Sequence, residues 1–156
     1  MNNDGKKIKR GKSRKKKSER KDYREGGNNM NEFSQKSLNI LNQCHLDLIK
    51  LFKEVIKEYD CTIACGYRGQ VDQEKAFNDG FSKAHWLQSP HNYLPALAVD
   101  VVPYPSLWSD QKKLKELSAI VKIKAIDLNI EIVCGIDWNY FSDVPHYELK
   151  DWKNKK

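Results

Sequence analysis

The chain has 156 residues, of which 39% are hydrophobic and 31% are charged, and its formal net charge is +7. This length allows one ordinary domain with a hydrophobic core, together with a tail. Charged residues interrupt every apolar run well short of the roughly 18 to 20 residues that a membrane-spanning helix needs, so a transmembrane protein is excluded. The basic start is followed by no apolar segment, and we therefore expect no secretory signal peptide.

The excess positive charge lies in residues 1–29. This segment holds 12 Lys/Arg and four acidic residues, a net charge of +8, whereas the rest of the chain carries 16 basic and 17 acidic residues. It has almost no large apolar side chains, so burial cannot offset the entropy cost of ordering it. We predict a disordered basic tail over 1–29 and a folded domain over 30–156. The tail could hold an anionic polymer, such as nucleic acid or a cell-wall polymer, or it could be a solvated extension without a partner.

The pattern of the remaining residues predicts a compact α+β domain. Apolar residues at three- and four-residue steps predict a helix over about 46–59, preceded by a shorter helix over about 35–43. The short apolar run 62–65 ends at Gly66 and predicts a buried strand. A helix over 70–79 follows and is closed by Gly80.

The second half of the domain completes the sheet. Residues 97–102 predict a strand between two prolines, and Ser109 is the expected N-cap of a helix that runs to about Leu128. Strands over 131–134 and 146–149 bring the total to four. We therefore expect a small, mainly antiparallel sheet flanked by helices.

The cysteines are Cys44, Cys61, Cys65 and Cys134, and no two of them form a CxxC pair. A four-sulfur zinc site normally contains such closely spaced pairs. The sequence therefore favours buried free thiols in a reducing compartment.

Asp100 is the most informative residue, because it lies in the middle of the apolar strand 97–102. Burial of an unpaired carboxylate costs several kcal/mol, so a cation or a metal should lie beside it. His91, in the preceding loop, and His146, at the start of the last strand, are the candidates to join it. Two histidines and an aspartate would give a zinc ion three protein ligands and leave the fourth position to water, as in catalytic zinc sites.

Each of these residues also has a simpler explanation. His91 could be a surface histidine, Asp100 could pair with Arg68, and His146 could be a half-buried strand residue. Two further histidines are weaker candidates: His45 lies at a helix start, and His85 lies in a polar loop where we expect no carboxylate partner.

Four ordered motifs carry a resemblance to a known family. Ser89-x-His91, Ala98-x-Asp100 and Asp143-x-Pro145-His146-x-Glu148 resemble the zinc D-alanyl-D-alanine carboxypeptidases and dipeptidases of the VanY and VanX types, and particularly their phage endolysin branch of L-alanyl-D-glutamate peptidases. The fourth motif is the Gly-Tyr-Arg segment at 66–68, which resembles a segment of the same family. The aromatic stretch 135–141 resembles the family too. The similarity runs from about residue 31 to residue 152.

The resemblance implies a fold, an activity and a set of site residues. The fold would be Hedgehog/DD-peptidase-like, and the enzyme would lyse the bacterial cell wall by cutting the L-Ala-D-Glu bond of peptidoglycan stem peptides. The implied zinc ligands are His91, Asp100 and His146, with Asp143 as general base and Arg68 as substrate-positioning residue. One departure concerns the loop after His91: its spacing to Asp100 is nine residues instead of the family's seven, and Leu94-Pro95 takes the place of a glycine. Such a lengthening costs little entropy if the strand keeps its register.

The chemistry requires a carboxylate that takes a proton from the attacking water. Alternation along the last strand puts Glu148 on the same face as His146, whereas Asp143 must reach the site from the preceding turn. Sequence geometry alone does not choose between them; the family pattern favours Asp143, and Glu148 could instead orient a ligand. Arg68 could bind a stem-peptide carboxylate or the developing oxyanion, or it could form an ion pair with Glu74 or another surface acid.

The sequence thus predicts a monomeric, zinc-dependent peptidoglycan peptidase that stays in the cytoplasm until holin-assisted release. Two alternatives remain open. One is a D,D-carboxypeptidase that releases the terminal D-Ala of the stem. The other is a nucleic-acid-binding protein whose basic tail binds and whose folded part is a zinc-stabilised scaffold.

Overall fold

The computed structural model describes residues 31–105, 108–140 and 142–155, so the tail predicted over 1–29 lies outside the described residues. The elements, in chain order, are α1 (Gln35–Leu41), α2 (Leu46–Glu58), β1 (Cys61–Cys65), α3 (Gln70–Asn78), the short 3-10 helix η1 (Pro90–Asn92), β2 (Ala98–Pro103), α4 (Gln111–Asp127), β3 (Ile132–Cys134), η2 (Gly135–Asp137), β4 (His146–Leu149) and η3 (Trp152–Asn154).

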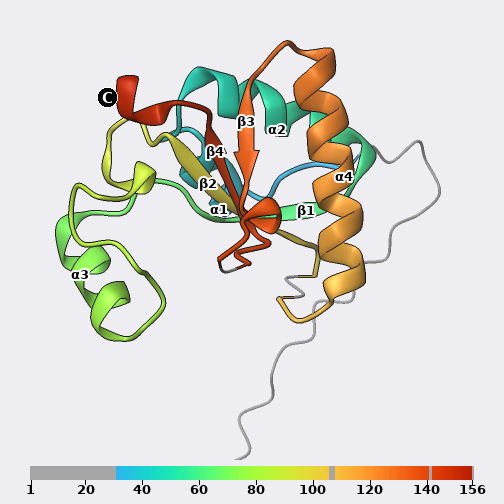
Figure 1. Cartoon of the computed structure of the whole chain (residues 1–156). Coiled ribbons are helices and arrows are strands. Elements are labelled where there is room, and N and C mark those ends of the chain that lie inside the picture. The colour runs from blue at the N-terminus through green and yellow to red at the C-terminus, as the bar shows by residue number, and fades with distance from the viewer. Residues whose placement is uncertain (1–30, 106–107, 141, 156) are drawn as a thin grey trace, which may run out of the picture.

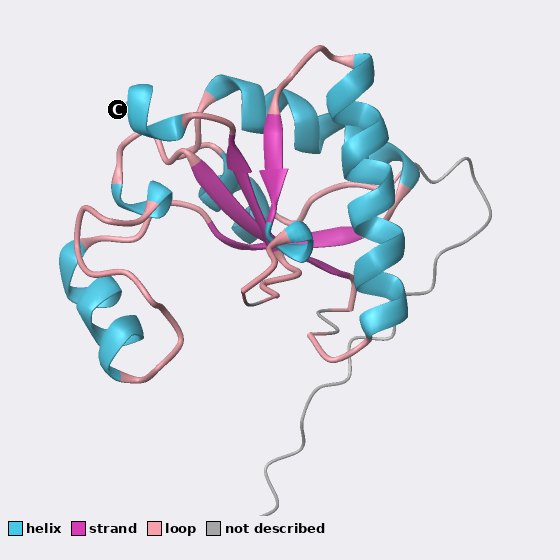
Figure 2. Cartoon of the chain, viewed as in Figure 1, coloured by secondary structure: helices cyan, strands magenta, loops and turns pink. Residues whose placement is uncertain are grey.

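The strands form one four-stranded sheet in the order β1-β2-β4-β3, and every neighbouring pair is antiparallel. The predicted α+β class with a small antiparallel sheet is therefore confirmed. In Figure 1, α2 and α4 lie together on one side of the sheet, whereas α3 stands apart at the far end of a long loop region. Figure 2 shows that the chain between α3 and β2 is mostly loop, interrupted only by η1.

The two faces of the sheet have different roles. The register pairs Val99 with Tyr147, and both side chains are buried in the core against α2 and α4. The same register pairs Asp100 with His146 and Ala98 with Glu148 on the opposite face. Alternation along the strands thus separates an apolar face, which holds the fold together, from a face that carries the polar groups.

Two of the predicted helix ends can be compared with the structure. Gly80 follows α3 with a φ of 79°, a left-handed conformation that suits glycine at a helix end. The prediction that Ser109 caps α4 is wrong by one residue, because Asp110 accepts a hydrogen bond from the backbone N–H of Lys113 at 3.1 Å. A carboxylate caps well at this position because it also interacts favourably with the positive end of the helix dipole.

All four cysteines are free, and Cys44, Cys61 and Cys134 are buried as predicted, whereas Cys65 is only partly buried. None of the helices in the described part of the chain is long and apolar enough to cross a membrane.

Candidate metal centre

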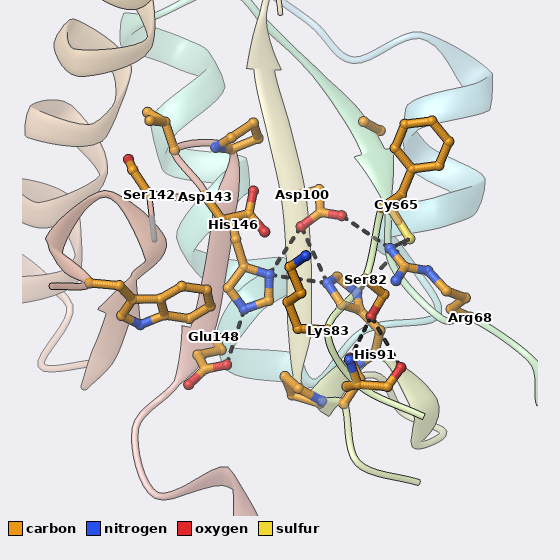
Figure 3. Close-up of a pocket in the computed structure, with 18 of the residues that line it drawn as sticks. Cys65, Arg68, Ser82, Lys83, His91, Asp100, Ser142, Asp143, His146 and Glu148 are labelled. Atoms are coloured by element: carbon orange, nitrogen blue, oxygen red, sulfur yellow. Dashed lines mark hydrogen bonds and ion pairs between the residues drawn. The ribbon is translucent and has the colours of Figure 1, made fainter. Parts of the chain in front are cut away.

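The polar face of the sheet opens into a cleft of about 1000 Å³. Its floor carries Asp100, His146 and Glu148 from β2 and β4. One wall comes from the loop after α3, and the other comes from the turn before β4. The cleft therefore collects side chains that are far apart in the sequence (Figure 3).

Three atoms form a nearly equilateral triangle in this cleft. His91 Nε2 lies 3.2 Å from His146 Nδ1 and 3.2 Å from Asp100 Oδ1, and His146 Nδ1 lies 3.1 Å from the same carboxylate oxygen. The structure thus brings together all three residues that the sequence suggests as zinc ligands, as Figure 3 shows. Four ligands placed tetrahedrally about 2.0 to 2.1 Å from a zinc ion lie about 3.3 Å from one another, so the spacing and the donor types fit zinc.

Hydrogen bonds fix which nitrogen of each histidine faces the triangle. His91 Nδ1 lies 2.7 Å from the carbonyl oxygen of Gly66, so Nδ1 donates and the neutral ring has its lone pair on Nε2. His146 Nε2 lies 3.0 Å from Glu148 Oε2, so the neutral ring has its lone pair on Nδ1. Partners of this kind orient metal-binding imidazoles and increase their basicity.

The electrostatics of the triangle favour positive charge at its centre. Burial alone would raise the pKa of Asp100, but attraction to His91 and the hydrogen bond from His146 bring it well below its usual range. Burial alone would lower the pKa of His91, yet the Asp100 carboxylate raises it to about 10. His91 and His146 are only 3% and 5% exposed, so water does little to screen the Asp100 carboxylate. A metal cation between the two rings would replace the protons that otherwise supply positive charge there.

The local sequence explains why His91 reaches the triangle despite the long loop. Ser89 caps η1 by accepting a hydrogen bond from the backbone N–H of His91 at 3.3 Å. The backbone N–H of Leu97 donates to the carbonyl of Pro90 at 2.9 Å, which closes residues 91–96 into a loop just before β2. The nine-residue spacing is therefore absorbed ahead of the strand, and Asp100 keeps its place opposite His146.

Asp143 lies on the wall of the cleft beside His146, in a tight turn that crosses Gly135. The backbone N–H of Asp143 donates to the carbonyl of Gly135 at 3.2 Å, and the N–H of His146 donates to the carbonyl of Asp143 at 3.0 Å. A Cβ on Gly135 would lie 2.2 Å from the carbonyl oxygen of Asp143, so only glycine fits here. Burial and the nearby charge of Asp100 raise the pKa of Asp143, which suits a proton acceptor near neutral pH.

Arg68 lies on the other side of the triangle. Its Nη2 is 3.5 Å from Asp100 Oδ2, and its backbone N–H donates to the carbonyl of His91 at 2.8 Å. The alternative pairing with Glu74 is not formed, because Glu74 accepts from the backbone N–H of Trp86 at 2.8 Å and lies 3.0 Å from His85 Nδ1. The expectation that His85 has no carboxylate partner is therefore wrong, because the side chain of Glu74 on α3 reaches it.

Cys65 is a site residue that the sequence analysis missed. It pairs with Asp100 across β1 and β2, lines the cleft, and forms with His91 and Asp100 a second group of possible metal ligands. Its Sγ lies 4.0 Å from His91 Nδ1, but this nitrogen donates a hydrogen bond to the carbonyl of Gly66. The other ring nitrogen of His91, Nε2, faces His146. We therefore favour the triangle with His146 as the ligand set. Pairing of the strand end with Asp100 is the signal that could have identified this cysteine.

Comparisons with known proteins give consistent results. Residues 30–152 match the profile of a family described as phage L-alanyl-D-glutamate peptidase. Among solved structures, the L-Ala D-Glu endopeptidase ChiX of Serratia marcescens has a TM-score of 0.68 and 23% sequence identity, and the alignment covers 78% of this chain and 92% of that chain. At this identity the likeness shows a shared fold. No curated protein sequence matches.

Proposed function

Because the chain belongs to the family of phage L-alanyl-D-glutamate peptidases, we propose that the cleft is a zinc-dependent active site that hydrolyses the L-Ala-D-Glu bond of peptidoglycan stem peptides. The chain is an enzyme that acts on peptidoglycan. The observation that supports the zinc site is the triangle of His91, Asp100 and His146, with ligand atoms 3.1 to 3.2 Å apart. A zinc ion held there would acidify a water molecule and polarise the scissile carbonyl.

Asp143 is the proposed general base. Its carboxylate accepts a proton from the attacking water as the oxygen bonds to the carbonyl carbon of L-Ala, and it passes that proton to the nitrogen of D-Glu as the C–N bond breaks. Glu148 is the alternative acid, but it already accepts a hydrogen bond from His146 at 3.0 Å. The two carboxylates thus have separate tasks: Asp143 moves the proton and Glu148 orients a ligand.

Arg68 is the proposed substrate-positioning residue. Its guanidinium lies beside Asp100 at the edge of the triangle and lines the same cleft. A planar guanidinium suits the negative charge that develops on the carbonyl oxygen during attack. The contact with Asp100, at 3.5 Å, is long for a charged hydrogen bond, so it leaves donors of the guanidinium for the substrate.

The test is a digest of purified peptidoglycan by the zinc-loaded protein, followed by mass spectrometry of the soluble fragments. The proposal predicts stem peptides that begin with D-Glu and glycan strands that retain L-Ala. Release of free D-Ala instead would indicate a D,D-carboxypeptidase and overturn the assignment of the bond.

We also propose that the basic segment 1–29 holds the enzyme on an anionic polymer of the cell wall after holin-assisted release from the cytoplasm. The net charge of +8 in this segment supports a salt-sensitive attraction. Deletion of residues 1–29 should weaken binding to intact walls at low salt and leave hydrolysis of a small soluble stem peptide unchanged. Equal wall binding by the full and shortened chains would contradict this role.

A further inference from the structure

The loop that follows α3 contributes a second positive charge to the cleft. Phe81, Ser82, Lys83 and Ala84 line the cleft on this side. Among the described residues that line it, only Arg68 and Lys83 carry a permanent positive charge, whereas three carboxylates, Asp100, Asp143 and Glu148, line it as well. A zinc ion in the triangle would compensate Asp100, but Asp143 and Glu148 would still repel an anionic substrate group, and a cation on this side of the cleft offsets that repulsion.

The two cations are in different situations. The guanidinium of Arg68 already contacts Asp100, Gln73 and Cys65 at 3.4 to 3.5 Å. The ammonium group of Lys83 has no hydrogen bond or ion pair within the described part of the chain, and its side chain is exposed at the cleft (Figure 3). The whole Lys83 ammonium group is therefore available for a ligand, whereas Arg68 offers only the donors that its own contacts leave.

A fully buried glutamine holds the loop in place. Gln73 is 0% exposed, and its Nε2 donates to Ser82 Oγ at 2.9 Å and to the carbonyl of Ala84 at 2.6 Å. Its Oε1 accepts from Asn92 Nδ2 at 2.9 Å and from Arg68 Nη1 at 3.4 Å. All four hydrogen-bonding positions of the amide are used.

This amide connects the loop to the metal centre. Two of its partners, Ser82 and Ala84, lie on either side of Lys83, and the other two are Arg68 and the neighbour of His91. The backbone at Lys83 is thus fixed relative to the triangle while its side chain is free to reach a ligand. Fixing a binding group in advance reduces the entropy that binding must overcome.

We propose that Lys83 binds the free α-carboxylate of D-Glu in the stem peptide, and that Gln73 is the positioning residue for Lys83. This inference rests on the proposed function. In a stem peptide D-Glu continues the chain through its side-chain carboxyl, so its α-carboxylate lies next to the scissile nitrogen. That carboxylate enters a cleft lined by three acids, where Lys83 supplies the compensating charge.

The experiment compares two synthetic stem peptides, one with the free α-carboxylate of D-Glu and one in which it is an α-amide. Lys83→Gln should raise KM for the acid peptide about five- to tenfold and change kcat by no more than about twofold. An effect of this size lies between those typical of exposed ion pairs and of buried charged hydrogen bonds. KM for the amide peptide should be the same in both proteins. Lys83→Arg should restore most of the affinity, and Lys53→Gln, on the exposed surface of α2, is the charge-matched control.

Gln73→Glu tests the positioning role. The carboxylate keeps acceptors for Asn92 and Arg68 but loses the donors to Ser82 and Ala84, so KM for the acid peptide should rise as it does in Lys83→Gln. Because both changes remove the same contact, the double variant should be no worse than the poorer single variant. Circular dichroism and zinc content of each variant report whether the fold and the metal centre persist. If the two changes instead raise KM by independent factors that multiply in the double variant, Gln73 does not position Lys83.

Binding of the product peptide separates this inference from the proposed function, because it requires no cleavage. Calorimetry should show the same five- to tenfold weaker binding of the D-Glu peptide by Lys83→Gln. If the unmodified protein binds the peptide in this Lys83-dependent way but cuts no L-Ala-D-Glu bond, the proposed function fails and the inference stands. If the protein cuts the bond and Lys83→Gln changes neither KM nor binding, or changes them equally for acid and amide peptides, the inference is wrong.

Discussion

The two sides of the cleft are built differently. On the sheet side, strand pairing fixes His146 and Asp100, the capped helix η1 next to β2 fixes His91, and a turn that fits only over Gly135 fixes Asp143. On the loop side, the exposed segment around Lys83 is held through one buried amide, that of Gln73. The groups that we propose to surround one metal ion lie on the rigid side, and the group that we propose to bind a substrate charge lies on the other.

The difference between the two sides predicts which kinetic constant a substitution changes. Changes on the sheet side should reduce zinc content or kcat, whereas changes on the loop side should mainly raise KM.

His91→Ala should have the largest effect, because it removes one of the three proposed ligands and leaves Asp100 with less compensating charge. We expect zinc content near zero after dialysis and hydrolysis below detection. Metal analysis and peptidoglycan digestion provide the measurement, with His85→Ala as the control, since His85 is exposed and pairs with Glu74. Full zinc stoichiometry in His91→Ala would remove this residue from the ligand set.

Asp143→Asn should keep the metal but lose the proposed proton acceptor. We expect kcat to fall about 10² to 10⁴-fold, the range for general-base groups, with zinc content unchanged. Stopped assays on a synthetic stem peptide measure the loss. If activity stays near that of the unmodified protein while Glu148→Gln loses it, the two carboxylates exchange their proposed roles.

Gly135→Ala should displace the turn that carries Asp143, because the new Cβ would lie 2.2 Å from a backbone oxygen. We expect a loss of about 1 to 3 kcal/mol in the free energy of unfolding, as in other overpacked sites, together with a lower kcat. Gly69→Ala is the matched control, since a Cβ there would meet its nearest atom at 3.8 Å. Denaturant unfolding and steady-state kinetics on both variants measure the difference; equal behaviour would mean that the turn relaxes without cost.

Glu148→Gln should weaken zinc binding about 10- to 100-fold, because it removes the charged partner that orients the His146 ring. Competition with a chelator measures this affinity. An unchanged affinity would show that the ring is held by packing against its neighbours, such as Trp138, whose ring centroid lies 5.0 Å away.

The sequence was sufficient to predict the sheet and to single out three residues, His91, Asp100 and His146, that the structure brings together in one triangle. Alternation places Asp100 on the face opposite the core, and the strand that begins at His146 has the predicted bounds 146–149. The sequence could not choose between Asp143 and Glu148, because the close crossing of the turn over Gly135 depends on tertiary contacts. Cys65 could have been identified from its place at a strand end that pairs with the strand of Asp100. The contacts of Gln73 were missed because its partners lie in loops whose positions a single sequence does not reveal.

X-ray absorption at the zinc edge of the zinc-loaded protein shows directly which of the proposed residues bind the metal. The two possible ligand groups share His91 and Asp100 and differ in whether His146 or Cys65 completes the set. With His91, Asp100 and His146 as ligands, the coordination shell should consist of nitrogen and oxygen at about 2.0 to 2.1 Å, with the pattern of two imidazoles and no sulfur. A sulfur contribution at about 2.3 Å would identify Cys65 as a ligand and contradict this ligand set.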